Sequence, residues 1–77
     1  MEVQILGTGC TKCKKLMANA EQAVREAGLD VHVEKVEDVL EIMKFQVMMT
    51  PALAVDGEVK AAGRVLSPEE IKKFLGV

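Results

Sequence analysis

The 77-residue sequence lacks the segments that would place it in a membrane, on nucleic acid or in the secretory pathway. Its longest apolar runs are a handful of residues, against the roughly 20 that a spanning helix needs. Residues 1–6 contain no basic region, long apolar stretch or small-residue cleavage site, so no secretory signal is expected. A net charge of −2 with no basic stripe argues against a nucleic-acid partner. We therefore expect a cytoplasmic protein with no membrane contact.

No linker, internal repeat or low-complexity segment divides the chain, so we expect one domain over residues 1–77. A domain of this size buries roughly 60% of the surface of its unfolded chain, which is close to the lower limit for a stable core. With 49% apolar and 29% charged residues, the composition is typical of a globular protein, which we expect to be a monomer.

Apolar segments with two different periodicities alternate along the chain. Strands are expected at 3–6, 31–36, 52–55 and 58–62, and helices at 11–27, from 37 or 38 to about 45, and from 68 to 75. A strand, a long helix and a second strand predict a parallel pair with a right-handed crossover. The order β-α-β-α-β-β-α predicts an α/β fold with a mixed four-stranded sheet and helices on both faces.

Two local signals predict the structure of the second half of the chain. Asp56-Gly57 between two β-prone runs predicts a tight hairpin. Ser67 followed by Pro68 and Glu70 predicts a capped helix start, and we expect that helix to turn three apolar side chains inward, namely Ile71, Phe74 and Leu75.

The two cysteines, Cys10 and Cys13, lie where the first strand gives way to the long helix. The helical period places Cys13 on the stripe that faces the core, whereas Cys10 falls at the first turn, outside that stripe. Dithiol–disulfide exchange needs an accessible thiol that attacks and a shielded thiol that resolves the mixed disulfide. In a reducing compartment such a pair is more often catalytic or metal-binding than structural.

Positive charge surrounds the predicted outer thiol. Lys12 and Lys14, together with the N-terminal end of the helix, would favour the thiolate form of Cys10 and lower its pKa from about 8.5 toward the range of roughly 3.5–7.5. The alternative is that these lysines are only part of a solvated helix face.

Cys10-Thr11-Lys12-Cys13, the Thr50-Pro51 pair and the β-β-α ending together resemble the thioredoxin-like superfamily, and within it the small glutaredoxin-sized redox proteins of archaea and bacteria. The resemblance implies a cis bond before Pro51, with Pro51 facing the cysteines and Thr50 offering its backbone to a substrate chain. It implies a thiol–disulfide oxidoreductase, without metal or other cofactor, that acts on protein disulfides and is recharged by a reductase. The acid that thioredoxins bury on the preceding strand has no clear counterpart, since Gln4 lies there.

Two other functions stay open from the sequence. Gly7 to Cys13 also resembles the loop of heavy-metal-associated domains, which bind soft ions such as Cu(I) through two thiolates, although those domains end in a strand. A binding module with incidental cysteines is the third possibility. Met48 and Met49 precede Thr50, and we expect at least one of them to fill the core. The alternative is that one of them is exposed near Cys10 as an adaptable apolar docking surface for a partner protein.

Overall fold

A computed structural model describes residues 1–9 and 11–76. The elements follow the predicted order: β1 (Val3–Leu6), α1 (Thr11–Glu26), β2 (Val33–Val36), α2 (Val39–Lys44), β3 (Ala52–Val55), β4 (Glu58–Ala62) and α3 (Pro68–Leu75). No helix in these two stretches is long and apolar enough to cross a bilayer.

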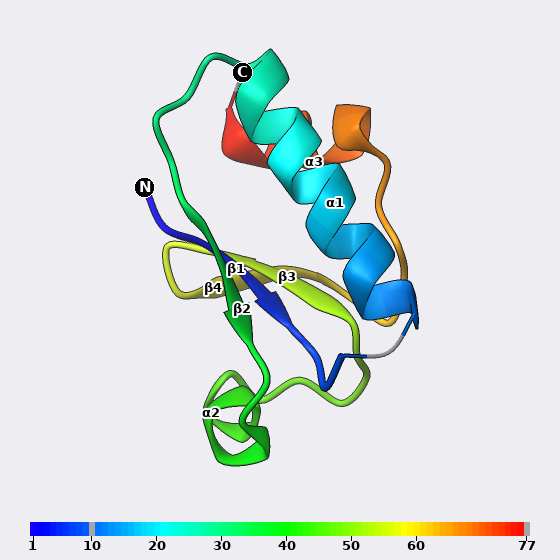
Figure 1. Cartoon of the computed structure of the whole chain (residues 1–77). Helices are drawn as coiled ribbons and strands as arrows, with labels where there is room; N and C mark the ends of the chain where they lie inside the picture. The colour runs from blue at the N-terminus through cyan, green and yellow to red at the C-terminus, as the bar shows by residue number, and fades with distance from the viewer. Residues whose placement is uncertain (10, 77) are drawn as a thin grey trace.

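The four strands form one mixed sheet in the order β2-β1-β3-β4 (Figure 1). β1 pairs with β2 in parallel, and with β3 antiparallel. The β3–β4 hairpin turns at Asp56 and Gly57, which both adopt positive φ, at 53° and 81°. The predicted α/β fold is therefore confirmed.

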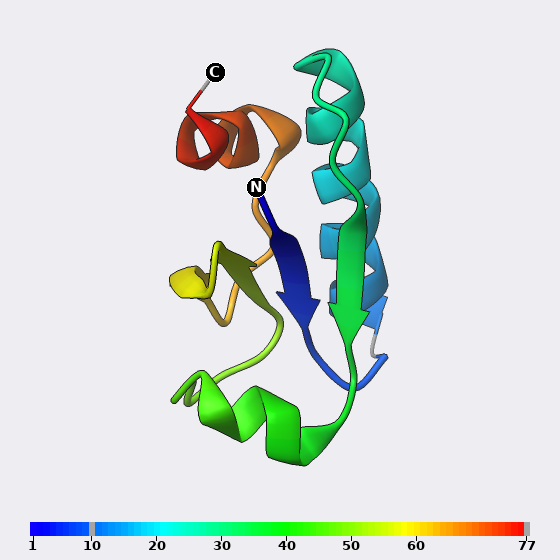
Figure 2. The same ribbon diagram turned by 90° about the vertical axis from the view of Figure 1, so that its left-hand side faces the viewer.

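The two faces of the sheet carry separate cores. α1 and α3 pack together on one face, where the buried residues include Leu16, Leu53 and Ile71. A smaller core on the other face joins Leu6 and Val36 to Ile42 of α2. Figure 2 shows α2 and the turn between β1 and α1 at one end of the molecule. α3 lies at the opposite end.

Two details of the prediction are wrong. The second strand begins at Val33 and not at Val31, because its partner β1 begins at Val3 and the register pairs Val3 with Val33. Phe74 is 38% exposed, because Ile71 and Leu75, one turn apart, define the buried stripe of α3 and Phe74 lies beside it.

The capping prediction for α3 is confirmed. The Ser67 Oγ accepts a hydrogen bond from the Glu70 backbone N–H at 3.2 Å, and the Glu70 carboxylate accepts one from the Ser67 N–H at 3.1 Å. Leu66, immediately before this cap, is fully buried, so the start of α3 is anchored on both its polar and its apolar side.

Candidate functional site

The site lies at the carboxyl end of β1, where the chain turns into α1. The Gly7 N–H donates to the Val36 carbonyl at 3.0 Å, which extends the β1–β2 pairing by one residue into the turn. α1 then starts at Thr11. α1 therefore starts at the end of the sheet where β1 and β2 both terminate.

Cys13 is packed into the wall of this site, as the helical phase predicts. Its side chain is only 4% exposed. A Cβ atom on Gly7 would overlap the Cys13 sulfur, and it would lie 3.9 Å from the Pro51 Cα. Glycine at position 7 is thus what allows β1, Cys13 and Pro51 to come together.

The Thr50–Pro51 peptide bond is cis, so this prediction is confirmed. Pro51 is fully buried and Thr50 is exposed. The Pro51 carbonyl accepts a hydrogen bond from the Gly63 N–H at 2.8 Å, which ties the segment to the end of β4. Thr50 and Pro51 thus lie at the same place as Cys13, next to Gly7.

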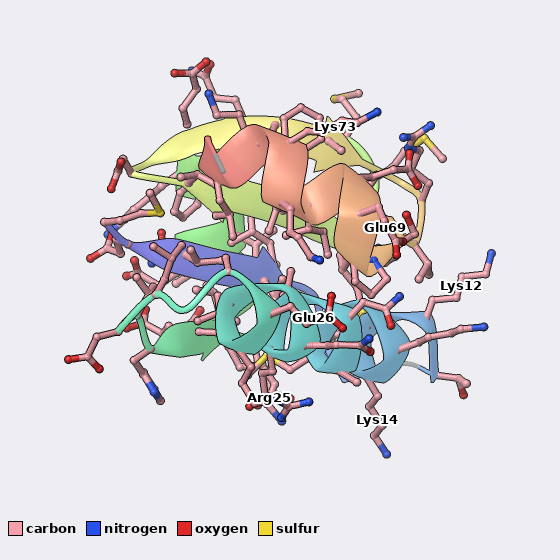
Figure 3. All side chains as sticks on the ribbon, turned by 90° about the horizontal axis from the view of Figure 1, so that it is seen from above. Lys12, Lys14, Arg25, Glu26, Glu69 and Lys73 are labelled. Atoms are coloured by element: carbon pink, nitrogen blue, oxygen red, sulfur yellow. The ribbon has the colours of Figure 1, made fainter. Side chains whose placement is uncertain are left out.

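Cys10 lies outside the described residues, so its role as the outer thiol stays a prediction. Lys12 and Lys14 are both exposed, and Figure 3 shows their side chains extending away from the ribbon in different directions. Their proposed effect on the pKa of Cys10 stays a prediction as well.

Met48 and Met49 are both exposed, at 95% and 62%. Met49 lies over Gly63: a Cβ there would be 3.1 Å from the Met49 Cβ and Cε atoms. The expectation that at least one of them fills the core is therefore wrong, because Ile42, Phe45 and Val47 already pack on that side of the sheet. The alternative, an exposed side chain for a partner protein, stays a prediction.

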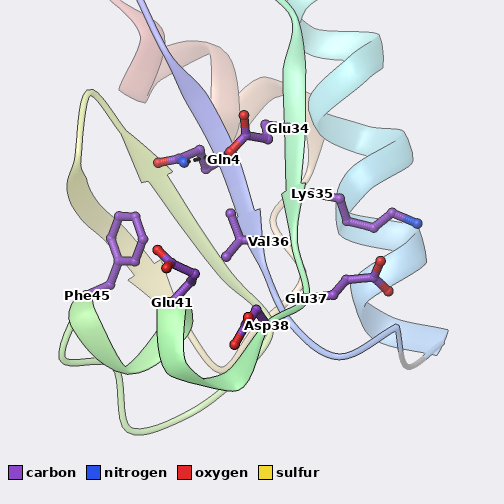
Figure 4. A pocket seen from close by; sticks show the side chains of 8 residues that line it. All are labelled: Gln4, Glu34, Lys35, Val36, Glu37, Asp38, Glu41 and Phe45. Carbon is purple, nitrogen blue, oxygen red and sulfur yellow. Dashed lines mark hydrogen bonds between the residues drawn. The ribbon is translucent and has the colours of Figure 1, made fainter.

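Glu37 is a neighbour of the cysteine turn that the sequence reasoning missed. Its Oε2 atom would lie 3.1 Å from a Cβ on Gly9, the residue that precedes Cys10. Figure 4 shows its carboxylate turned away from Glu41 and Phe45. The parallel β1–β2 pair was the available signal, because the carboxyl ends of parallel neighbours meet at one sheet edge.

Gln4 lines a cavity of about 380 Å³ between the sheet and α2 (Figure 4). Its Nε2 donates to Glu34 Oε1 at 3.0 Å, whereas its Oε1 is buried without a hydrogen-bond partner among the described residues. An amide does not titrate in the physiological range, so this position supplies no counterpart of the buried acid of thioredoxins.

A mixed sheet, a shielded thiol in the first turn of a helix and a cis-proline packed beside it define the thioredoxin class of fold and site. A family model described as "Thioredoxin domain" matches residues 1–76. A protein named thioredoxin from Methanothermobacter thermautotrophicus is 49% identical over 75 residues, which cover 97% of each chain. A second, from Methanocaldococcus jannaschii, is 42% identical over 73 residues, which cover 95% of this chain and 84% of that one.

The chain belongs to the thioredoxin family. Its activity is that of a thiol–disulfide oxidoreductase. None of the matches supports the soft-metal alternative.

Proposed function

We propose that Cys10 and Cys13 exchange a disulfide with partner proteins, with Cys10 as the attacking thiolate and Cys13 as the resolving thiol. The observation that carries this assignment is the packing of Cys13 beneath Gly7 and beside Pro51, at 4% exposure. A protein substrate cannot reach a thiol so enclosed, so the first attack falls to the other cysteine.

The reaction proceeds in two exchanges. The Cys10 thiolate attacks one sulfur of the substrate disulfide, that S–S bond breaks, and the other substrate sulfur leaves as a thiolate that takes up a proton. The Cys13 thiol loses its proton and attacks the Cys10 sulfur, which releases the second substrate thiol and forms the Cys10–Cys13 disulfide. Two electrons have passed to the substrate, and a dithiol reductant or reductase restores the pair.

The neighbouring residues have separate tasks in this proposal. Thr50, which is exposed, presents its backbone to the substrate segment, and Pro51 forms the buried wall behind it. Lys12 and Lys14, with the N-terminal end of α1, favour the thiolate of Cys10. We further propose that residues 1–77 act as one monomeric domain in the cytoplasm, where reductases keep such pairs reduced.

Trapping of the mixed disulfide tests the assignment. With insulin as the probe disulfide, Cys13→Ser should accumulate a covalent complex that dithiothreitol releases, because the second exchange is removed. Cys10→Ser should form none. In the reduced wild-type protein, Cys10 should react with iodoacetamide much faster than Cys13 at neutral pH, and equal rates would reject the assignment of the two roles.

A further inference from the structure

The short helix α2 turns most of its apolar side chains to the outside. Ile42 is its one buried residue, whereas Val39, Leu40 and Met43 are 57%, 70% and 63% exposed. The loop that follows adds Met48 and Met49. We call these five side chains the α2 surface: Val39, Leu40, Met43, Met48 and Met49.

The chain on either side of α2 leads to the cysteine site. At the start of the helix, Glu37 lies against Gly9, the residue before Cys10. At the far end, Met49 lies over Gly63 and leads directly into the cis Thr50–Pro51 bond. A polypeptide that places its disulfide at the cysteines would therefore have the α2 surface beside it.

Carboxylates border this apolar surface. Asp38 caps α2 by accepting from the Leu40 N–H at 2.8 Å, and Glu41 pairs with Lys44 at 3.0 Å. Glu37 forms no hydrogen bond or ion pair with any residue in the described part of the chain. The carboxylate nearest to the cysteine turn is thus available to a positively charged group of a partner.

We infer that the α2 surface docks the substrate protein, in the form of a segment next to the reactive disulfide that carries apolar side chains and a lysine or arginine. This inference rests on the proposed function and adds the class of substrate to it. Methionine side chains adapt to differently shaped partners, as an enzyme with several substrates requires. A surface of five side chains suits a brief redox encounter and is small for a stable dimer.

A second copy of the chain is a poorer occupant. Three carboxylates against one lysine border each α2 surface, so a symmetric contact would bring two borders of net negative charge together. Like charges placed across an interface oppose association. A basic, apolar segment meets both the charge and the exposed side chains of this surface.

Matched disulfide-bridged peptides test the inference. Three peptides share the same apolar residues and differ only at one position beside the disulfide, which is Lys, Ser or Glu. The protein reduces them with dithiothreitol as the recycling reductant, and insulin serves as the general substrate. The variants are Leu40→Ser/Met43→Ser and Glu37→Gln, with Phe74→Ser and Glu69→Gln on α3 as matched controls that are exposed and distant from α2 (Figure 1).

The wild-type protein should favour the Lys peptide over the Glu peptide. Leu40→Ser/Met43→Ser should raise KM for all three peptides by about tenfold without lowering kcat, because apolar contact with the bound segment is lost. Glu37→Gln should raise KM for the Lys peptide by about threefold, as expected for an exposed ion pair, and leave the Ser peptide unchanged. The urea midpoints of these variants should match the wild-type midpoint, and the two control variants should keep wild-type KM values.

Three results would overturn the inference. KM values that stay at the wild-type level in Leu40→Ser/Met43→Ser and in Glu37→Gln, with insulin still reduced, would remove the docking role and leave the proposed function intact. A dimer seen by sedimentation velocity and abolished by Leu40→Ser/Met43→Ser would assign the surface to a second copy. Failure to reduce insulin, together with no trapped complex for Cys13→Ser, would reject the proposed function and this inference with it.

Discussion

The two faces of the sheet differ in how completely their helices bury apolar side chains. On the face covered by α1 and α3, twelve of the described residues form one buried core. Among the described residues of α1 and α3, the most exposed large apolar side chain is Phe74, at 38%. On the other face, five of the described residues form the buried core. α2 and the loop after it expose five large apolar side chains, as many as that core has residues. The first face stabilises the fold, which leaves the second free to serve as a contact surface.

Truncation of one apolar side chain on each face is the strongest test of this comparison. Leu16→Ala should lower the free energy of unfolding by about 3 kcal/mol, because Leu16 is fully buried in the larger core and its loss leaves a cavity. Leu40→Ala, at a side chain that is 70% exposed, should change it by less than about 0.5 kcal/mol. Urea denaturation measures both, and similar losses would contradict the division of roles.

Gly7→Ala tests the close packing of Gly7 against Cys13 and Pro51 at the site. The new methyl group would overlap the Cys13 sulfur, so either Cys13 or Pro51 has to move, and we expect a loss of about 2 kcal/mol from overpacking. Thr8→Ala is the control, because Thr8 is exposed in the same turn and should keep wild-type stability. A stable Gly7→Ala protein with unchanged insulin reduction would show that the close approach is unnecessary.

Ser67→Ala weakens the helix that covers the larger face, without touching the core itself. Loss of the hydrogen bond from the Glu70 N–H to Ser67 Oγ should cost about 1 kcal/mol. Chemical denaturation gives the magnitude. Ser67→Thr, which keeps the hydroxyl, should restore most of the stability, and equal losses for Ala and Thr would argue against a capping role.

The pH dependence of the same cap should give the smallest effect. The hydrogen bond from the Ser67 backbone N–H lowers the pKa of Glu70 below its ordinary value of 4.5, with help from the Ser67 hydroxyl and Arg64. A lowered folded-state pKa stabilises the protein above pH 4.5, and this contribution is lost as the pH falls through the folded-state value. The stability difference between wild type and Glu70→Gln should therefore shrink below pH 4.5, and a constant difference would contradict this linkage.

Sequence signals that act over a few residues predicted the fold well. The helical phase of α1 placed Cys13 in the core, Asp56-Gly57 marked the hairpin, and the Ser67 cap marked the start of α3. Each of these depends on backbone conformation or periodicity within one or two turns, which the local sequence determines.

Features that depend on contacts between distant segments of the chain were harder to predict. The first residue of β2 depends on where β1 begins, and the exposed face of α2 depends on the small part of the sheet that α2 covers. The contact between Glu37 and the turn at Gly9 joins residues 28 positions apart, through the register of two parallel strands. Thr50 and Pro51 were identified through the family resemblance, whereas Glu37 required the structure.

The position of β2 at the edge of the sheet bears on how copies of the protein behave when they are concentrated. An edge strand carries unpaired backbone groups that can join a strand from another molecule into a growing sheet. The two central residues of β2, Glu34 and Lys35, are charged and exposed, one on each face. Charged side chains on an edge strand disfavour such pairing, so the same four-residue strand that completes the sheet also discourages aggregation.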